Sequence, residues 1–597
     1  MKRRSIGQSP SRMRRTPAAR RFECIVETVF YGILALAFCW PMSSLSVDRI
    51  FMRQFDYFGV IWTAAYWAAP GASWTSSLTA WPMGESLRRM DSNIFGGLAR
   101  LMAVLMTPAR FSASFGVIGL TISAWAAARC AREGFGVSRP ASLAAGIVYA
   151  FNGLSATALL EGHIYFLLDP WLPLLLLSLR RLGAPDGRWT DGIRAGLYWT
   201  ASLLTSAYLG LLGGILAAAE LARGFWIRED GRAFLRRASG FIGLGCLSAL
   251  AYLDFFLAGG GGKAGQTGQT LEAGSATLIG LTTWVPNIDL YHHSIASPLG
   301  FALVALLLLG QRLIRWAPGW RLLAVFVLAV PLCALGPRAQ MGLPSRLRIE
   351  TPMMILEETP LGAYLHFPVR FMWLYYLCAG LVAALILERL RASAGNRSVY
   401  AVIAVLVADA FIGSAVPLRM GNLSSAVPSA YSAAPSDRAV LDFFAAPPFD
   451  GYENQWYFER TTCYYQSVHR RAVLQPCIQT YFDNPRRRVS SRLFDVILAR
   501  KASSFSAQEA QWIRDLMASM GVGAVAVHLD LIPNEFHDDL LEGFRALFGP
   551  ARARSSDGGE HIVLFVIDGM RADNPREVYE RLITGELQFR RDERGAR

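Results

Sequence analysis

Long apolar runs separated by short polar connections fill the first two thirds of the chain. A helix that crosses a bilayer needs about 20 mostly apolar residues, so these runs predict transmembrane helices, about eleven in all. Together they indicate a polytopic α-helical membrane domain over residues 24–418. The predicted spans are 24–45, 111–128, 141–160, 165–179, two within 193–221 joined near Ser206, 234–257, 298–309, 322–335, 371–387 and 399–416.

The hydropathy falls after Pro417 and the pattern changes. Strand-like runs then alternate with helical ones, an alternation that is typical of a small α/β domain. We therefore predict a second domain over residues 419–597, which is long enough to bury a core of its own. The strand-like runs are 439–444, 522–527 and 562–567, and the helical runs are 507–520 and 538–548.

Composition and charge agree with a membrane protein, since 53% of the residues are hydrophobic and only 17% are charged. Basic residues gather in the tail before Cys24 and in short connections, as the positive-inside rule describes. This distribution predicts a cytoplasmic tail (1–23), an uncleaved signal anchor, and a multi-pass protein of the cytoplasmic membrane. The second domain then lies on the periplasmic or extracellular side. The net charge of +14 therefore reflects topology and contact with membrane lipid, and we expect no nucleic-acid partner.

The first predicted outer loop, residues 46–110, begins with two acids, Asp48 and Asp56. The aromatic residues after Asp56 recur mostly at helical spacing, which predicts a helix lying in the membrane interface with its aromatic face in the headgroup layer. Such a helix would hold a carboxylate near the depth of a lipid phosphate. Asp56, and after it Asp48, is thus a candidate catalytic base. The alternative is an acid that ends a span or caps a helix. A second short helix is expected at 94–106.

Several other polar residues fall on the same predicted face of the membrane. Arg370 lies at the start of the 371–387 span. There a guanidinium can bind two phosphate oxygens at once, or it can simply snorkel to the interface. His163 and Glu161 lie in the turn between two spans, and either could face a phosphate or a sugar or satisfy a helix end. Arg53 could bind phosphate or pair with Asp56.

Two further elements complete the sequence-based picture of this face. Tyr291 and His292 could line the acceptor side, but His292 is followed directly by another histidine and has no third metal ligand, so no metal site is predicted. Asp169, which precedes Pro170, is expected to help a helix begin. Among the cysteines, only Cys463 and Cys477 lie in the polar region, where they could form a disulfide or remain two thiols.

Several segments together resemble bacterial polytopic membrane proteins of the GT-C glycosyltransferase superfamily, near its YfhO-like and mannosyltransferase-like members. The resemblance covers most of the chain through short motifs. These are Asp56 with Trp62, AWPMGESL (80–87), GHIYFLLDPWLPLLLLSLRR (162–181), CALGPR (333–338), FPVRFMW (367–373), YYQSVHRRAV (464–473) and MGVGAVAVH (520–528).

The resemblance implies an inverting transfer of a sugar from a polyprenyl-phosphate donor to a glycan, lipid or protein acceptor on the outer side of the membrane. It assigns the role of base to Asp56, with Asp48 as the fallback. The paired-acid form of the family motif is missing, because the two acids are not arranged as Asp-x-Asp. No cofactor is therefore assigned, and a divalent metal stays an option. The residues alone also fit a transporter or flippase of lipid-linked glycans, or a scaffold that binds cell-envelope glycan.

Overall fold

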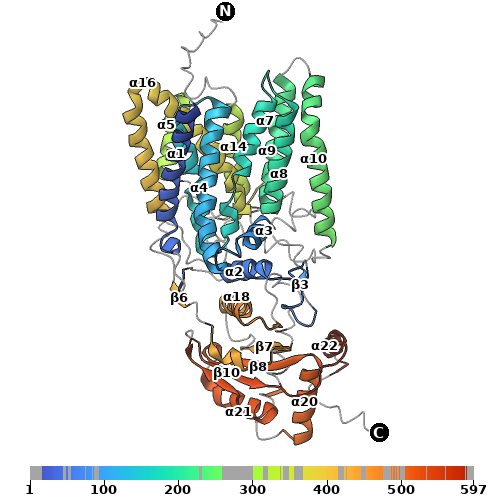
Figure 1. The fold of residues 1–597 in the computed structure, drawn as a ribbon. Coiled ribbons are helices and arrows are strands. Elements are labelled where there is room, and N and C mark those ends of the chain that lie inside the picture. Colours follow the sequence, from blue (N-terminus) through green and yellow to red (C-terminus); the bar gives the residue numbers. More distant parts are fainter. Residues whose placement is uncertain are drawn as a thin grey trace, which may run out of the picture.

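Apolar helices pack side by side in the computed structural model and form a bundle, and a smaller domain built on a β-sheet lies beyond one end of this bundle (Figure 1). The end of the bundle that faces this domain is called the domain end below. The structure describes residues 17–44, 49–51, 56–73, 75–83, 85–86, 93–227, 231–258, 300–313, 320–336, 338–340, 348–351, 353–354, 368–414, 422–424, 427–444, 452–474, 486, 489–490, 493, 496–497, 505–532, 534–557, 560–584 and 586–587.

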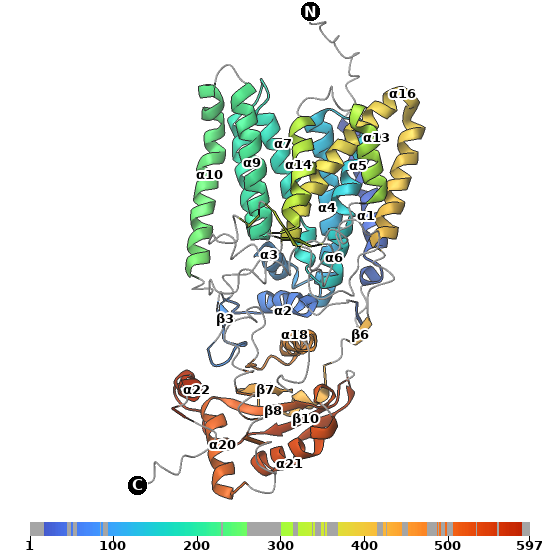
Figure 2. The same cartoon turned by 180° about the vertical axis from the view of Figure 1, so that it is seen from behind.

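The bundle helices follow the predicted spans closely. Figure 2 shows the far side, where α13 and α14 lie beside α16. The bundle helices are α1 (Pro17–Phe38), α4 (Pro108–Phe135), α5 (Arg139–Ala150), α6 (Gly153–Glu161), α7 (Trp171–Leu182), α8 (Trp189–Thr205), α9 (Ala207–Ile227), α10 (Gly231–Ala258), α13 (Phe301–Gly310), α14 (Trp320–Ala334) and α16 (Met372–Ser414). Short 3-10 turns precede α7 and α16 and follow α1 and α13; these are η2 (Ile164–Leu167), η6 (Pro368–Phe371), η1 (Met42–Ser44) and η4 (Gln311–Leu313).

Three breaks shape the bundle. The helix pair α8 and α9 is interrupted at Ser206, whose backbone is extended, so the predicted division of 193–221 is confirmed. The pair α5 and α6 is bent by 40° where the predicted 141–160 span was expected to be continuous. In α16 the backbone of Gly395 has a φ of 81°, which separates the two predicted spans at 371–387 and 399–416.

The predicted number of about eleven spans is not confirmed. Among the described residues, three helices are long and apolar enough to cross a membrane, or four if the bent pair counts as one span. One reason is helix length, because α7, α13 and α14 have only 12, 10 and 15 residues. The three long helices are Pro108–Phe135, Ala207–Trp226 and Pro368–Gly413.

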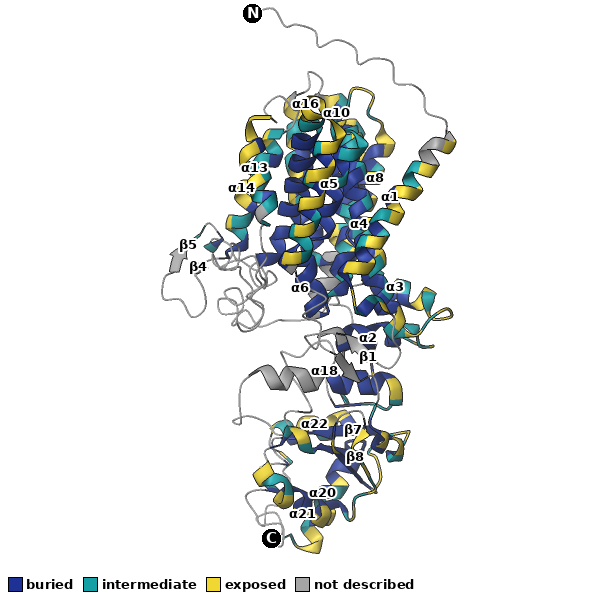
Figure 3. Cartoon of the chain, turned by 90° about the vertical axis from the view of Figure 1, so that its left-hand side faces the viewer, coloured by how far each residue is buried: buried dark blue, intermediate teal, exposed yellow. Residues whose placement is uncertain are grey.

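The surface of the bundle is apolar where lipid would lie. On α1, six large apolar side chains are exposed, although the same helix buries Tyr31, Ala35 and Phe38 against its neighbours. Figure 3 shows this contrast between a buried interior and exposed outer faces. Large exposed apolar surface is unusual in a water-soluble protein, so the chain is a helical membrane protein. The six residues are Phe22, Ile25, Val26, Val29, Ile33 and Leu36.

The C-terminal domain (residues 427–587) carries a four-stranded sheet of order β7-β8-β10-β9. Strand β8 is buried at every position, and it pairs in parallel with β7 and antiparallel with β10. The predicted strands and the two predicted helices of this α/β domain are all present. Its elements are η7 (Ser429–Ala433), β7 (Ala439–Phe443), α18 (Tyr452–His469), α20 (Ala507–Ser519), β8 (Val522–His528), η9 (Leu529–Leu531), η10 (Asn534–Phe536), α21 (His537–Phe548), β9 (Ala553–Ser555), β10 (Ile562–Val566) and α22 (Pro575–Thr584).

The predicted first outer loop connects the two parts. It contributes α2 (Asp56–Ala68) and the expected short helix, α3 (Asn93–Met102), at the domain end of the bundle (Figure 1). Strand β1 (Arg49–Phe51) pairs antiparallel with β6 (Asn422–Ser424), which lies between the bundle and the C-terminal domain. Two more short hairpins form, β2 (Thr75–Ser76) with β3 (Glu85–Ser86), and β4 (Arg338–Gln340) with β5 (Arg348–Glu350).

Candidate functional site

A buried arginine lies at the domain end of the bundle, against two aromatic rings. Arg370, in η6, is only 9% exposed. Its guanidinium carbon is 4.5 Å from the ring centroid of Phe166 and 4.8 Å from that of Tyr208, the second residue of α9. Cation–π contacts of this kind contribute about 0.5–2 kcal/mol each. They use the face of the guanidinium, and its N–H groups lie in the plane, where they can donate to oxygen.

His163 joins the same cluster. Its ring lies edge-on to Phe166 with 6.2 Å between centroids, and edge-on to Tyr165 with 5.9 Å. Phe166 therefore contacts both His163 and Arg370, two residues that are far apart in sequence and that were predicted to serve one site. Glu161 is the last residue of α6, and nothing of its side chain is described.

A hydrogen-bond network fixes the segment that carries Phe166. The hydroxyl of Ser123 in α4 donates to the carbonyl of Leu167 and accepts from the backbone N–H of Asp169, both at 2.9 Å. Asp169 accepts from the Tyr149 hydroxyl at 2.5 Å and from the N–H of Leu172 at 3.4 Å. The prediction that Asp169 helps a helix begin is thus confirmed for α7.

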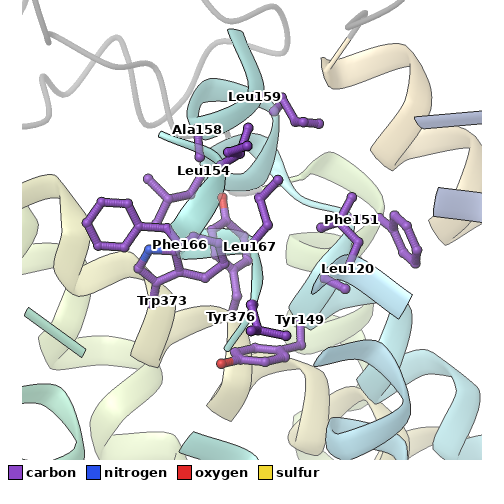
Figure 4. Close-up of a cluster of buried hydrophobic side chains, with 14 of the residues drawn as sticks. Leu120, Tyr149, Phe151, Leu154, Ala158, Leu159, Phe166, Leu167, Trp373 and Tyr376 are labelled. Carbon is purple, nitrogen blue, oxygen red and sulfur yellow. The ribbon is translucent and has the colours of Figure 1, made fainter. Parts of the chain in front are cut away.

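The same segment is packed in a buried apolar cluster (Figure 4). Phe166 and Leu167 lie near Leu154 and Leu159 of α6, while Tyr149 approaches Trp373 of α16, with 6.4 Å between ring centroids. Close packing on all sides holds side chains in single rotamers. The aromatic surface against which Arg370 lies is therefore rigid.

Asp56 is the first residue of α2, and its side chain is not described. The prediction for the aromatic face of this helix is wrong. Phe58, Trp62 and Tyr66 are 3%, 1% and 7% exposed, so they do not reach a headgroup layer. The physical reason is that α18 of the C-terminal domain covers them. The ring of Phe58 stacks on Tyr464 at 5.1 Å between centroids.

The remaining candidates from the sequence lie outside the described residues. They are Asp48, Arg53, Tyr291 and His292. Among the side chains that are described, no group of three or more His, Cys, Asp or Glu residues is arranged to hold a metal ion. The described part thus brings together His163 and Arg370 and places the start of α2 at the same end of the bundle (Figure 1).

The motif at 80–87 docks the outer loop on the C-terminal domain. The indole N–H of Trp81 donates to the carbonyl of Met520 at 2.7 Å, and the guanidinium of Arg571 lies over the Trp81 ring at 4.6 Å. The backbone N–H of Trp81 also donates to the carbonyl of Val473 at 3.1 Å, which ties the loop to the domain. This motif therefore has a structural task, which its sequence did not reveal.

A second polar cluster lies inside the C-terminal domain, and no pattern in the sequence predicted it. His528, at the end of β8, contacts Asp442 of β7 and Glu560, and Tyr431 of η7 donates to Asp442. Burial lowers the pKa of His528, but hydrogen bonds to the two carboxylates outweigh it and raise this pKa to about 9. Nearby, burial lowers the pKa of His469 to about 4, and its ring stacks on Tyr431.

Buried acids within the bundle were also missed. Glu27 of α1 is 3% exposed and pairs with Arg132 at 2.6 Å, and Glu220 of α9 is equally buried and pairs with Arg223 at 2.6 Å. The spacing of Glu220 and Arg223, three positions on a helix, is a signal that could have found the second pair. The Glu27–Arg132 pair joins α1 to α4, whereas the Glu220–Arg223 pair lies within α9. Cys463 is disulfide-bonded, while Cys477 lies outside the described residues.

Comparison by sequence finds no matching family model and no matching curated protein. Comparison by structure does find matches. The arabinofuranosyltransferase AftD from Mycobacteria has a TM-score of 0.56 and 14% identity, and the match covers 93% of this chain and 42% of AftD. The chain thus spans less than half the length of AftD.

The oligosaccharyltransferase of Archaeoglobus fulgidus matches with a TM-score of 0.45 and 10% identity, over 88% of this chain and 72% of that chain. The AftD match, at 14% identity, shows a shared fold and nothing finer. The resemblance noted in the sequence motifs is confirmed at that level. Over 93% of its length, the chain shares the fold of AftD, which is named as an arabinofuranosyltransferase.

Proposed function

We propose that this protein is a membrane glycosyltransferase that moves a sugar from a polyprenyl-phosphate donor to an acceptor at the domain end of the bundle. The observation that carries the proposal is the buried Arg370, which lies on a rigid aromatic surface beside His163. A fixed guanidinium suits a phosphate, because its planar N–H groups match phosphate oxygens in pairs. The fold shared with AftD, named as an arabinofuranosyltransferase, supports the same class of reaction.

In the proposed reaction, a hydroxyl of the acceptor attacks the anomeric carbon of the donor sugar from the side opposite the phosphate. A new glycosidic C–O bond forms while the bond between sugar and phosphate breaks, so the configuration inverts. Asp56, with Asp48 as the fallback, takes the hydroxyl proton. Polyprenyl phosphate leaves with the bonding electrons, and Arg370 neutralises its charge.

The other candidates take supporting roles in this proposal. His163 and Arg53 assist Arg370 at the phosphate, and Glu161, Tyr291 and His292 serve the sugar or acceptor side. The bundle (24–418) lies in the cytoplasmic membrane with the basic tail (1–23) in the cytoplasm. The domain end, with the C-terminal domain (419–597), then faces the periplasm or the cell exterior, where lipid-linked sugars are used as donors.

The experiment that tests this function uses purified protein in lipid nanodiscs with a panel of polyprenyl-phosphate sugars. It measures release of polyprenyl phosphate and transfer of the sugar. We expect turnover by the wild type, a loss of at least a hundredfold in Asp56→Asn, and a smaller loss in Asp48→Asn. Each variant must keep the thermal unfolding midpoint of the wild type.

A wild type that binds a donor but never breaks the sugar–phosphate bond would contradict the proposal. The same protein in sealed vesicles then decides between the alternatives. Movement of a labelled lipid-linked glycan across the bilayer would indicate a flippase, and binding without movement would indicate a scaffold.

A further inference from the structure

Helix α2 carries the proposed base at its first position, and it is held between two parts of the protein. Phe58, Trp62 and Tyr66 are spaced four residues apart, so they lie on one face of the helix. This face meets α18, where Trp62 and Tyr66 form a buried cluster with Cys463. On another face, the Trp67 ring packs against α3 at Gly96, within 2.7 Å of the point where a Cβ would stand.

One hydrogen bond fixes α2 on α18 directionally. The indole N–H of Trp62 donates to Oε1 of Gln466 at 2.7 Å, and both side chains are buried, at 1% and 2% exposure. The Nε2 of Gln466 is buried and has no hydrogen-bond partner among the described residues. A half-satisfied buried amide is unfavourable for stability alone. Its presence here therefore calls for a reason other than the stability of the domain.

The rotation of α2 about its own axis decides where position 56 lies. Successive residues of an α-helix are about 100° apart, so position 56 is about 120–160° around the axis from Phe58 and Trp62. Position 56 therefore lies on the side of α2 away from α18, together with Trp67. Contacts at Phe58 and Trp62 set this rotation. If α2 turned by one residue, both rings would lose their packing against α18.

We infer that Gln466 is a positioning residue, which acts through Trp62 to hold α2 at the rotation that keeps position 56 on the side of the helix away from α18. The inference rests on the proposed function for its catalytic part. It makes the C-terminal domain part of the catalytic apparatus through its contact with α2. Tyr464 stacks on Phe58, which is two positions after Asp56, and this contact supports the same orientation of α2.

The test compares two indole hydrogen bonds of equal length across the same interface. Trp62→Phe and Gln466→Met remove the bond that lies on α2. Trp81→Phe removes the 2.7 Å bond to Met520, which lies on the loop and not on α2. Full-length variants in nanodiscs are assayed for kcat and KM with the polyprenyl-phosphate sugar that the wild type uses.

We expect kcat to fall ten- to a hundredfold in Trp62→Phe and in Gln466→Met, while KM for the donor changes less than threefold. The acidic limb of the kcat–pH profile should move in both variants, because the surroundings of the base change. Trp81→Phe should keep kcat within twofold and leave that limb in place, even if it melts at a lower temperature. Equal losses of kcat in all three variants, or none in Gln466→Met, would overturn the inference.

A measurement that needs no activity distinguishes failure of the proposed function from failure of the positioning inference. Hydrogen exchange of the α2 amides should become faster in Gln466→Met and stay unchanged in Trp81→Phe. If the wild type shows no turnover, the proposed function is wrong, and faster exchange in Gln466→Met still supports the positioning of α2. Unchanged exchange in that variant overturns the positioning itself.

Discussion

The Nε2 of His528 lies 3.1 Å from Oδ1 of Asp442, and each side chain is only 1% exposed. The other ring nitrogen lies 3.0 Å from Oε2 of Glu560. Both ring nitrogens can donate only when the imidazole is protonated, so a charged histidine joins two buried carboxylates. This ion triad ties β7 and β8 to Glu560, two residues before β10, inside the C-terminal domain.

The triad predicts how stability changes with pH. The pKa of His528 is raised from 6.5 to about 9 on folding, so its contribution is fully present below pH 6.5 and is lost as the pH rises through 9. This rise in the pKa of His528 corresponds to about 3 kcal/mol in the free energy of unfolding. Thermal unfolding of the C-terminal domain, followed by circular dichroism between pH 6 and 10, should show a falling midpoint.

His528→Gln should flatten this dependence and lower the midpoint at pH 6.5. The matched control is His561→Gln, which removes a 2.9 Å contact with Asp530 on the exposed surface. Its pH dependence should equal that of the wild type. A His528→Gln variant with the wild-type slope would show that the triad does not govern it.

Arg370→Lys tests whether the guanidinium shape matters and not only its charge. Lysine keeps the charge but loses the planar donors and the stacking on Phe166 and Tyr208. We expect kcat/KM for the polyprenyl-phosphate donor to fall at least tenfold, since charge-assisted hydrogen bonds contribute about 1.5–3 kcal/mol each. The control is Arg312→Lys, because Arg312 is exposed in η4, and it should retain wild-type kinetics. Equal kinetics for the two variants would remove Arg370 from the site.

Tyr149 and Asp169 should be energetically coupled. Tyr149→Phe, Asp169→Asn and the double variant form a mutant cycle, which can be measured by thermal unfolding in detergent. We expect each single change to destabilise the bundle by about 1–3 kcal/mol and the coupling energy to exceed about 0.5 kcal/mol. Thr121→Val serves as the control, because the Thr121 hydroxyl bonds only within its own helix. Additive effects would contradict the network.

Gly521 and Gly549 provide a matched pair of substitutions. Both have a positive φ, 79° and 81°, so alanine is strained at each. At Gly521 the added Cβ would also stand 3.1 Å from the Trp81 ring, whereas nothing lies within 4 Å at Gly549. Gly521→Ala should therefore destabilise more than Gly549→Ala, and should alone speed hydrogen exchange in residues 75–86. The reverse order of stability would show that the loop does not press on this turn.

Local patterns in the sequence predicted most of the elements. The apolar runs predicted the bundle helices and the break at Ser206, and the strand-like run at 522–527 predicted β8. The predicted number of spans is not confirmed, because α13 and α14, with 10 and 15 residues, are shorter than the length that a span needs. His163 and Arg370 were found because each lies at the boundary of an apolar run, His163 after one and Arg370 before another.

Long-range relationships could not be predicted. Aromatic residues at helical spacing fit a headgroup layer and a protein partner equally well, and the partner of Trp62 lies 404 positions later in the chain. The ion triad could not be predicted for the same reason, because Asp442 and His528 are 86 positions apart and the residues next to each in sequence form no recognisable motif. Burial of these groups follows from tertiary contacts, which no local pattern contains.

The pairing of β1 with β6 also dictates an order of events during biosynthesis. Arg49 pairs with Ser424, so the ribosome delivers one strand long before the other. At about 5–20 residues per second, the wait is on the order of tens of seconds. For most of that interval, Trp62 and Trp81 have left the ribosome while Gln466 and Met520 have not. A chain truncated after the bundle would display these indoles permanently, which makes it a natural substrate for membrane quality control.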